Sequence, residues 1–199
     1  MLKTQTIIDV NNAMKTMLEK YLGNKFVISF VLPELDTRPS NEMVSVFLYD
    51  IHEDLQLRTT ESRAFNTSSG KLLPGRVNIK CNYLITYWES TRSEIDLSSP
   101  DSQPDNQAIK VMSQVLNALI NNRQLTGIPG AYTQVVPPKE SLNSLGNFWQ
   151  SLGNRPRLSL NYSVTVPISL TDAEDEVTPV STLSSTVEQM TQITSLSQK

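Results

Sequence analysis

The stretch Arg76–Ser90, RVNIKCNYLITYWES, limits the possible folds of this chain more than any other part of it. Its odd positions in Val77–Tyr87 are all apolar, whereas the even positions begin as Asn78, Lys80 and Asn82. Because successive side chains on a β-strand point to opposite faces, this alternation predicts one dry face and one polar face. Such a strand spans roughly 40 Å at about 3.3 Å per residue, well beyond the usual length. We therefore expect a structural strand rather than the wall of a small pocket.

A second stretch, Arg157–Ile168, has the same character with the opposite parity, because its even positions are apolar and its odd positions up to Thr165 are polar. The two strands could pair. Pro167 suits a sheet edge or a strand end, since proline has no N–H for the ladder. The combined polar face is expected to meet solvent or a partner through Asn78, Lys80, Asn82, Arg157, Ser159, Asn161 and Ser163.

Two segments have the periodicity of amphipathic helices. In Thr6–Leu22 the apolar residues recur at steps of three and four, and Gly23 provides a stop. In Gln107–Asn121 the apolar side is wide and Lys110 is the one charged residue. Most of the circumference of this second helix is therefore expected to be covered.

The remaining segments predict shorter elements. Lys25–Val31 is rich in β-forming residues, and Met43–Ile51 is apolar on both faces, as in a central strand covered from both sides. The following HEDLQLR either continues that strand or returns beside it after a turn at His52–Asp54. The sequence GIPGAYTQVVPPKE predicts an irregular connector, and Leu142–Leu152 a short helix.

This order of elements predicts an α+β fold in a single domain, residues 1–170, with a mainly antiparallel or mixed sheet whose long strands pack under helices. Residues 171–199 are rich in Ser, Thr and Gln and carry five acids against Lys199, which predicts a flexible tail. With a chain net charge of −3, the domain itself is nearly neutral. Nucleic-acid binding is therefore not expected, because it needs a clustered basic surface.

The sequence gives no sign of export or membrane insertion. The N-terminus lacks a signal-peptide pattern, and no apolar run approaches the roughly 18 residues that span a bilayer. Cys81 is the single cysteine and falls on the dry face of its strand, so we expect a buried structural thiol. The expected compartment is a reducing cytosol.

The motifs of common active sites are missing. His52 is the one histidine, which leaves no zinc site and no Ser-His-acid triad, and a turn residue is its simplest interpretation. SSGKLLPGR lacks the spacing of a phosphate-binding loop, and DAEDE lacks the pattern of an EF-hand. A carboxylate pair cannot be judged without coordinates. We expect no enzyme, no metal and no cofactor.

Aromatic and polar residues outside the core face are the candidates for contacts with a partner. Trp88 lies on the polar side of its strand, whereas Tyr83 and Tyr87 lie on the dry side and are expected in the core. The full set of candidate interface residues is Trp88, Lys80, Asn82, Arg157, Ser159, Asn161, Trp149 and Arg58.

Four blocks, taken in order, resemble one family: VSVFLYDIHEDLQLR, RVNIKCNYLITYWES, NQAIKVMSQVLNALI and LGNFWQSLGNRPRLSLNYSVTVPI. The family is the cap, or tail-terminator, protein of extracellular contractile injection systems, the particles typified by the Photorhabdus virulence cassettes and the antifeeding prophage. Each block consists of packing residues, so their serial agreement is what carries the resemblance. The tail beyond Leu170 lies outside it.

The resemblance implies a ring of copies, expected to be a hexamer, on the end of the particle distal to the baseplate. There it would stop the inner tube and anchor the last sheath layer, which makes the tube protein and the sheath protein its partners. It implies no catalytic residue. Assembly in the bacterial cytoplasm, within a particle that is later released, is the corresponding expectation.

A ring also needs open surfaces, and we expect either Arg157–Ile168 or Lys25–Val31 to provide an open sheet edge that can accept an extended arm. Three alternatives stay open. They are another tube-end or baseplate adaptor of the same particle, a monomeric ligand-binding module that uses the polar face with Trp88, and an enzyme with an unfamiliar carboxylate site.

Overall fold

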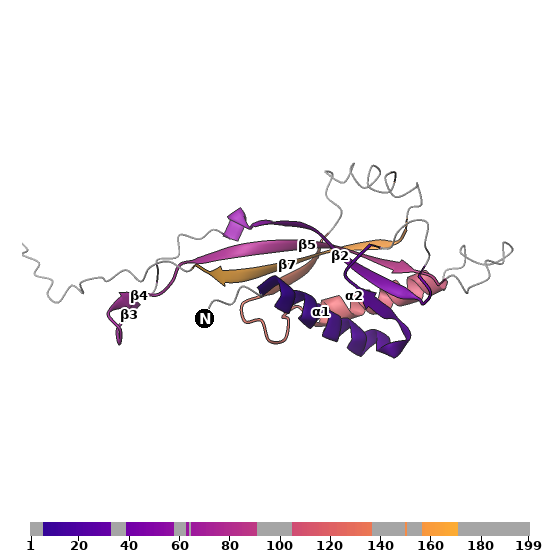
Figure 1. Cartoon of the computed structure of the whole chain (residues 1–199), viewed down its shortest axis with the longest axis horizontal. Coiled ribbons are helices and arrows are strands. Elements are labelled where there is room, and N and C mark those ends of the chain that lie inside the picture. Colours follow the sequence, from indigo (N-terminus) through magenta and orange to yellow (C-terminus); the bar gives the residue numbers. More distant parts are fainter. Residues whose placement is uncertain are drawn as a thin grey trace, which may run out of the picture.

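The computed structural model describes residues 6–32, 39–57, 63, 65–90, 105–136, 150 and 157–170 of the chain. Two long helices and one large sheet make up most of this part (Figure 1). In chain order the elements are α1 (Thr6–Leu22), the 3-10 turn η1 (Gly23–Lys25), β1 (Val27–Ser29), β2 (Met43–Glu53), η2 (Leu55–Leu57), β3 (Phe65–Asn66), β4 (Lys71–Leu72), β5 (Arg76–Trp88), α2 (Gln107–Asn121), β6 (Tyr132–Val136) and β7 (Ser159–Ser169).

The main sheet has the strand order β1-β2-β5-β7-β6, and β3 pairs with β4 in a separate small hairpin. The pairs β2–β5, β5–β7 and β6–β7 are antiparallel, and β1 lies parallel to β2. The long strands predicted at Arg76–Ser90 and Arg157–Ile168 do pair, with Tyr83 opposite Tyr162. The mixed sheet with helices confirms the α+β prediction.

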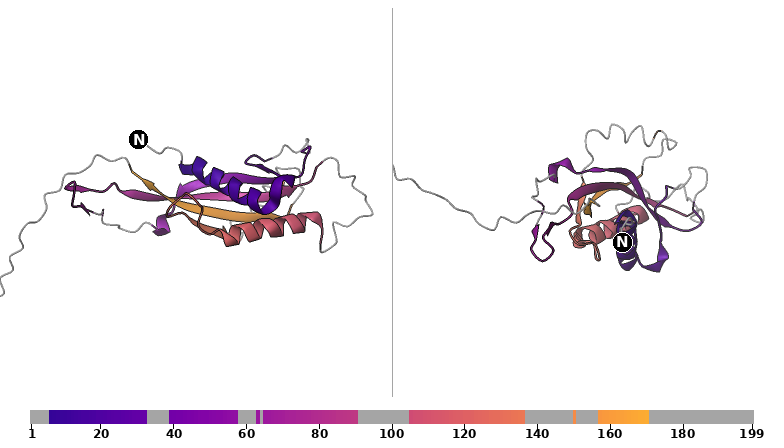
Figure 2. Two further views of the ribbon diagram at one scale, coloured as in Figure 1. Left: turned by 90° about the horizontal axis from the view of Figure 1, so that it is seen from below. Right: turned by 60° about the vertical axis from the view of Figure 1, so that its left-hand side comes forward.

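Both helices pack on the same side of the sheet (Figure 2). Their apolar stripes meet the dry face of β5, where Tyr83 and Ile85 have no solvent exposure. The Tyr83 hydroxyl donates a hydrogen bond of 2.9 Å to Asn11 Oδ1 on α1, so this buried polar group is satisfied. The deepest helix residues are Val10, Met14, Leu18, Val115 and Ala118.

Local sequence signals account for the helix ends. Gly23 has a φ of +69°, the left-handed conformation in which glycine ends helices without strain. At the start of α2, Asn106 caps the helix through its side-chain oxygen, which accepts from Ile109 N at 2.8 Å. Both helices therefore have the predicted limits.

Two strands differ from the predictions. The expected strand at Lys25–Val31 is only Val27–Ser29, because η1 occupies the chain up to Lys25. The predicted irregular connector contains β6, Tyr132–Val136, which pairs with β7. Tyr132, Thr133 and Val135 are of types common in strands, but glycine and proline residues flank the segment, and its strand conformation is seen from its pairing with β7.

The segment HEDLQLR continues β2 as far as Glu53 and then forms η2, so it does not return as a neighbouring strand. His52 is a strand residue opposite Lys80, and the predicted turn assignment is wrong. The prediction that this strand is covered on both faces is also wrong for its second half, because only Met43–Val46 are buried. The ends of β5 and β7 extend past α1 toward the β3–β4 hairpin (Figure 1).

Pro167 lies in β7, which is an inner strand rather than an edge. However, β6 ends at the level of Thr165, so at Pro167 the described sheet has a neighbour on the β5 side alone. This explains how proline fits the strand. The predicted helix at Leu142–Leu152 (apart from the single helical residue Gln150) and the tail 171–199 lie outside the described residues.

Candidate interaction surfaces

The polar face of the sheet is less open than its sequence pattern predicts. Trp88, Asn161 and Ser163 are exposed by only 6%, 8% and 1%, so the prediction of an open face is wrong at these positions. Lys80, Asn82, Arg157 and Ser159 keep intermediate exposure. The two remaining interface candidates, Arg58 and Trp149, lie outside the described residues.

Trp88 is buried because its own neighbours use its ring and its N–H. The guanidinium of Arg157 lies over the ring at 4.2 Å from its centre, and the indole Nε1 donates to Thr86 Oγ1 at 2.8 Å. A cation over an indole face is a favourable electrostatic contact. In the isolated chain Trp88 is therefore an internal anchor between β5 and the start of β7, and it offers little surface to a ligand.

Two side-chain atoms on this face are buried and have no hydrogen-bond partner: Asn161 Oδ1 and Ser163 Oγ. Both belong to β7. Short side chains on a strand are shielded by longer neighbours, and Ser163 lies between Asn82 on β5 and Gln134 on β6. Buried polar atoms without partners carry a desolvation cost.

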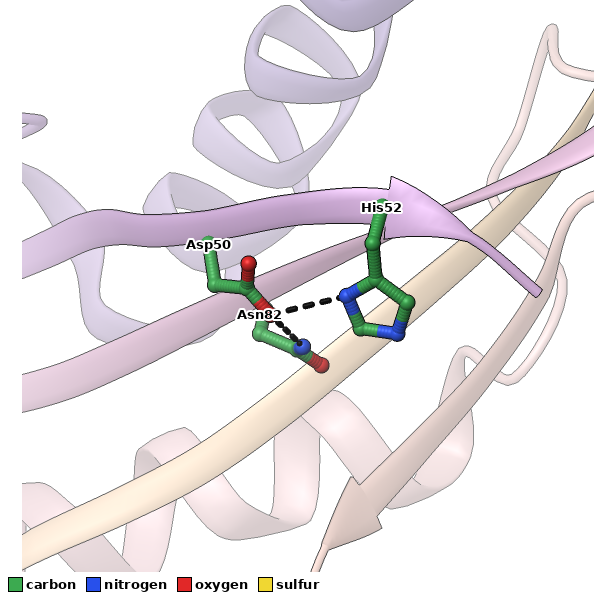
Figure 3. Close-up of polar contacts among 3 residues, drawn as sticks. All are labelled: Asp50, His52 and Asn82. Atoms are coloured by element: carbon green, nitrogen blue, oxygen red, sulfur yellow. Dashed lines mark hydrogen bonds and ion pairs between the residues drawn. The ribbon is translucent and has the colours of Figure 1, made fainter.

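A cluster of polar side chains lies near the C-terminal end of β2 (Figure 3). Asp50 Oδ2 accepts a hydrogen bond of 2.8 Å from Asn82 Nδ2 and lies 2.8 Å from His52 Nδ1. The bond from Asn82 is the main cause that lowers the pKa of the Asp50 carboxyl, and His52 adds to it, while partial burial opposes both. A β-bulge at Tyr49, between Leu48 and Asp50, brings these side chains to one face of the sheet.

The described part of the cluster does not form a catalytic triad. A base in a triad is hydrogen-bonded to a nucleophile on its other side, whereas the hydrogen bond of His52 goes to Asp50. The described residues also contain no group of three or more His, Cys, Asp or Glu that could hold a metal ion. Cys81, with no solvent exposure, has a pKa raised mainly by burial, the opposite of an activated thiol.

A hollow of about 560 Å³ lies in the loop between α2 and β6. It is open, and its lining contains no acid, base or nucleophile: Gln124, Leu125, Gly127, Ile128, Pro129, Gly130 and Ala131. This hollow lacks the convergent polar groups of a ligand pocket.

The edges of the sheet are better candidates for contacts with a partner than the hollow or the polar face. β1 is an edge strand, as predicted for Lys25–Val31, whereas the prediction of an edge at Arg157–Ile168 is wrong because β6 covers β7. β1 pairs with Met43–Ser45 alone, so most of β2 has no second neighbour among the described strands. Exposed apolar side chains lie toward both edges of the sheet, at Tyr49 and Ile51 on β2 and at Tyr132 on β6.

Comparison with known proteins identifies the family of this chain. The model of the Pvc16 N-terminal domain matches residues 9–182. The chain belongs to the Pvc16 N-terminal domain family. This confirms the resemblance to cap proteins drawn from the four sequence blocks. A comparison with proteins of curated function finds no match.

Two solved structures are similar to this chain over most of its length. One is a sheath/tube terminator, PVC, of an extracellular contractile injection system in the extended state, with 72% identity and a TM-score of 0.73 over 96% of this chain and 66% of that chain. The other is the tube-terminating cap of the anti-feeding prophage, with 68% identity and a TM-score of 0.72 over 92% of this chain and 62% of that chain. This chain thus spans slightly less than two thirds of the length of either structure.

No helix among the described residues is both long and apolar enough to cross a membrane.

Proposed function

We propose that this chain is a structural cap of a contractile injection particle, placed at the end distal to the baseplate. It terminates the inner tube and anchors the last sheath layer. The observation that carries this proposal is the 72% identity, over 96% of this chain, to a sheath/tube terminator. At that level of identity the same assembly role is the simplest inference.

The proposed partners are copies of the chain itself, in a ring of six, together with the tube protein and the sheath protein. A terminator must match the last tube layer and present no surface on which another layer can add, and a closed ring satisfies the lateral contacts between its own copies. Among the described strands, β6 and the part of β2 beyond Ser45 have no outer neighbour, and they provide surface for such contacts. Assembly precedes release, so the cap forms in the bacterial cytoplasm and leaves with the particle.

The proposed role is not enzymatic. Among the described residues, the one histidine pairs with Asp50 and contacts no nucleophile, and the one cysteine is buried. The alternative of a monomeric ligand-binding module is weakened. It relied on Trp88 as a contact residue, and Trp88 is covered by Arg157.

Electron microscopy of particles assembled with and without this chain tests the proposal. Without the chain we expect tubes of uncontrolled length, or sheath that does not stay extended, and normal particles when the chain is supplied again. Particles of normal length and stability in its absence contradict the terminator role. A baseplate adaptor would instead leave particles that lack an organised baseplate.

A further inference from the structure

The two edges of the sheet lie at the same level along the strands. On one side, Phe47–His52 of β2 has no neighbouring strand among the described residues, because β1 stops at the level of Ser45. On the other side β6 is the last strand. The registers join the edges row by row, since Tyr132 lies in one row with Thr165, Lys80 and His52. The row of Gln134 likewise leads through Ser163 and Asn82 to Asp50.

The strand directions of the two edges are also compatible. β2 is antiparallel to β5, β5 to β7, and β7 to β6, so β6 and β2 run in opposite directions. If a second copy is placed beside the first in the same orientation, its β6 meets β2 as an antiparallel neighbour. Antiparallel pairing uses the unpaired N–H and C=O groups that each edge strand presents.

We propose that these two edges join in the assembled cap, so that β6 of one copy pairs with Phe47–His52 of the next. The sheet then runs without interruption from copy to copy. This inference rests on the proposed function, which supplies the ring. It adds the surface that closes the ring and the residues that meet there.

The side chains of the two edges are complementary when the rows are continued without an offset. Asp50 then lies beside Gln134 of the next copy, whose amide can donate to the carboxylate. His52 lies beside Tyr132 of the next copy, whose hydroxyl can reach the ring nitrogen that faces away from Asp50 (Figure 3). The polar cluster of β2 thus gains a role as one half of a contact between copies.

The composition of both edges favours pairing over protection. Edge strands of monomeric proteins carry lysine, proline or inward charges that prevent association. The edge FLYDIH of β2 and the edge YTQVV of β6 contain neither lysine nor proline. They expose apolar area instead, with Ile51 exposed by 48% and Tyr132 by 54%. Two features that usually protect an edge are present, the bulge at Tyr49 and the charge of Asp50, and Gln134 of the next copy would lie beside that charge.

The equal level of the edges explains why such a joint would close. A heterologous contact makes a ring when repetition returns to the start, and a helical filament when each step also rises. Edges at the same height add no rise along the strands. Repetition about an axis parallel to the strands then closes into a ring when the rotation from copy to copy is a whole fraction of a turn.

Cysteine cross-linking tests the joint directly. His52→Cys and Tyr132→Cys are combined in the full chain, since directly opposed residues on paired strands have Cβ atoms about 4.5–5.5 Å apart. With a short bismaleimide we expect a ladder of covalent multimers on a denaturing gel, ending at the closed ring. Each single variant, and the wild type with its buried Cys81, should give no ladder. A control pair on the exposed helix surface, Lys15→Cys with Ser113→Cys, should give none either.

A charge placed in the joint provides the second test. Ile51→Lys should convert the ring to monomers at micromolar concentration by size-exclusion chromatography with light scattering, with unchanged circular dichroism. The matched control Ile8→Lys, on α1 at 55% exposure, should leave the ring intact. A ring that resists Ile51→Lys and gives no ladder overturns the joint while the cap function stands. A chain that neither forms rings nor enters particles contradicts the proposed function itself.

Discussion

The guanidinium carbon of Arg157 lies 4.2 Å from the centre of the Trp88 ring, which fastens the segment before β7 to the last residue of β5. A cation over a partly desolvated indole contributes about 1 kcal/mol. Arg157→Met keeps the length of the side chain and removes its charge. We expect it to lower the free energy of unfolding by about that amount in urea titrations, and to increase the fluorescence change of the indole on quencher addition.

Arg157→Lys is the control for charge alone, since an ammonium group lacks the planar stacking of guanidinium. Its loss should be smaller than that of Arg157→Met. Equal stability of Arg157→Met and the wild type is the result that excludes a stabilising role for the stack.

Gly130 is predicted to resist substitution more strongly than Gly127. Both have positive φ, +79° and +85°, so alanine costs roughly 1–2 kcal/mol at either position. At Gly130 an added Cβ would also lie 3.0 Å from Pro167 Cγ, whereas at Gly127 nothing lies within 4 Å. Thermal unfolding should therefore show a lower Tm for Gly130→Ala than for Gly127→Ala. Equal Tm values would mean that the chain moves away from Pro167 without cost.

Tyr83 should make the protein sensitive to alkali. Burial is the main cause that raises the pKa of its hydroxyl, so the native state holds this proton more tightly than the unfolded state does. The resulting stabilisation is fully present below the unfolded pKa of about 10 and is lost as pH rises toward the folded pKa. In that window each such tyrosine removes about 1.4 kcal/mol of stability per pH unit.

Tyr83→Phe separates this effect from the hydrogen bond to Asn11. At pH 7 the variant should lose about 1 kcal/mol, because Asn11 loses its donor. Between about pH 10 and 11 its stability, measured by urea unfolding, should fall less steeply with pH than that of the wild type. Parallel pH profiles for the two proteins would contradict the assignment to Tyr83.

The pKa of the Asp50 carboxyl should depend on both of its hydrogen-bonding partners. Its pKa is lowered chiefly by the bond from Asn82 and further by the hydrogen bond and the charge of His52, so Asn82→Ala and His52→Ala should each raise it. Because the folded pKa is depressed, the small stabilisation is present above the unfolded pKa and is lost as pH falls through the folded one. Carbon NMR of the carboxyl group during titration measures both shifts. An unchanged pKa in either variant would contradict the contribution of that partner.

Leu18 should be among the costly positions of the core. It has no solvent exposure and packs between α1 and the sheet, so Leu18→Ala should remove about 2–5 kcal/mol of unfolding free energy. Ile8→Ala, on the exposed side of the same helix, is the matched control and should change stability by less than about 1 kcal/mol. Denaturant unfolding compares the two. Similar losses would mean that the contact of α1 with the sheet is loose.

The helices and the long strands could be predicted because their signals are local. Gly23 and Asn106 mark helix ends through their own conformation and hydrogen bonds, and the alternation of Arg76–Ser90 describes a strand whatever its neighbours are. β6 could not be predicted in this way. Its five residues form a strand because β7 lies beside them, and the sequence does not encode that neighbour locally.

The candidate site was predictable in part. Periodicity assigned Trp88 to the polar face, but it could not show that Arg157, distant in the chain, covers the ring. The Asp50–His52 pair had a signal, since residues two apart on a strand share a face. Its partner Asn82 depends on the register of β2 against β5, and a bulge shifts that register by one residue. Burial and register depend on the tertiary structure, so local sequence patterns do not predict them.

The central position of β5 has a mechanical consequence. This strand is held by antiparallel ladders on both sides, to β2 and to β7, along nearly its whole length. Ladder hydrogen bonds lie perpendicular to the strands, so a force along β5 loads many of them at once in shear, whereas a sideways force opens them one after another. The domain is therefore stiff along its long axis and most easily peeled at the short strand β1.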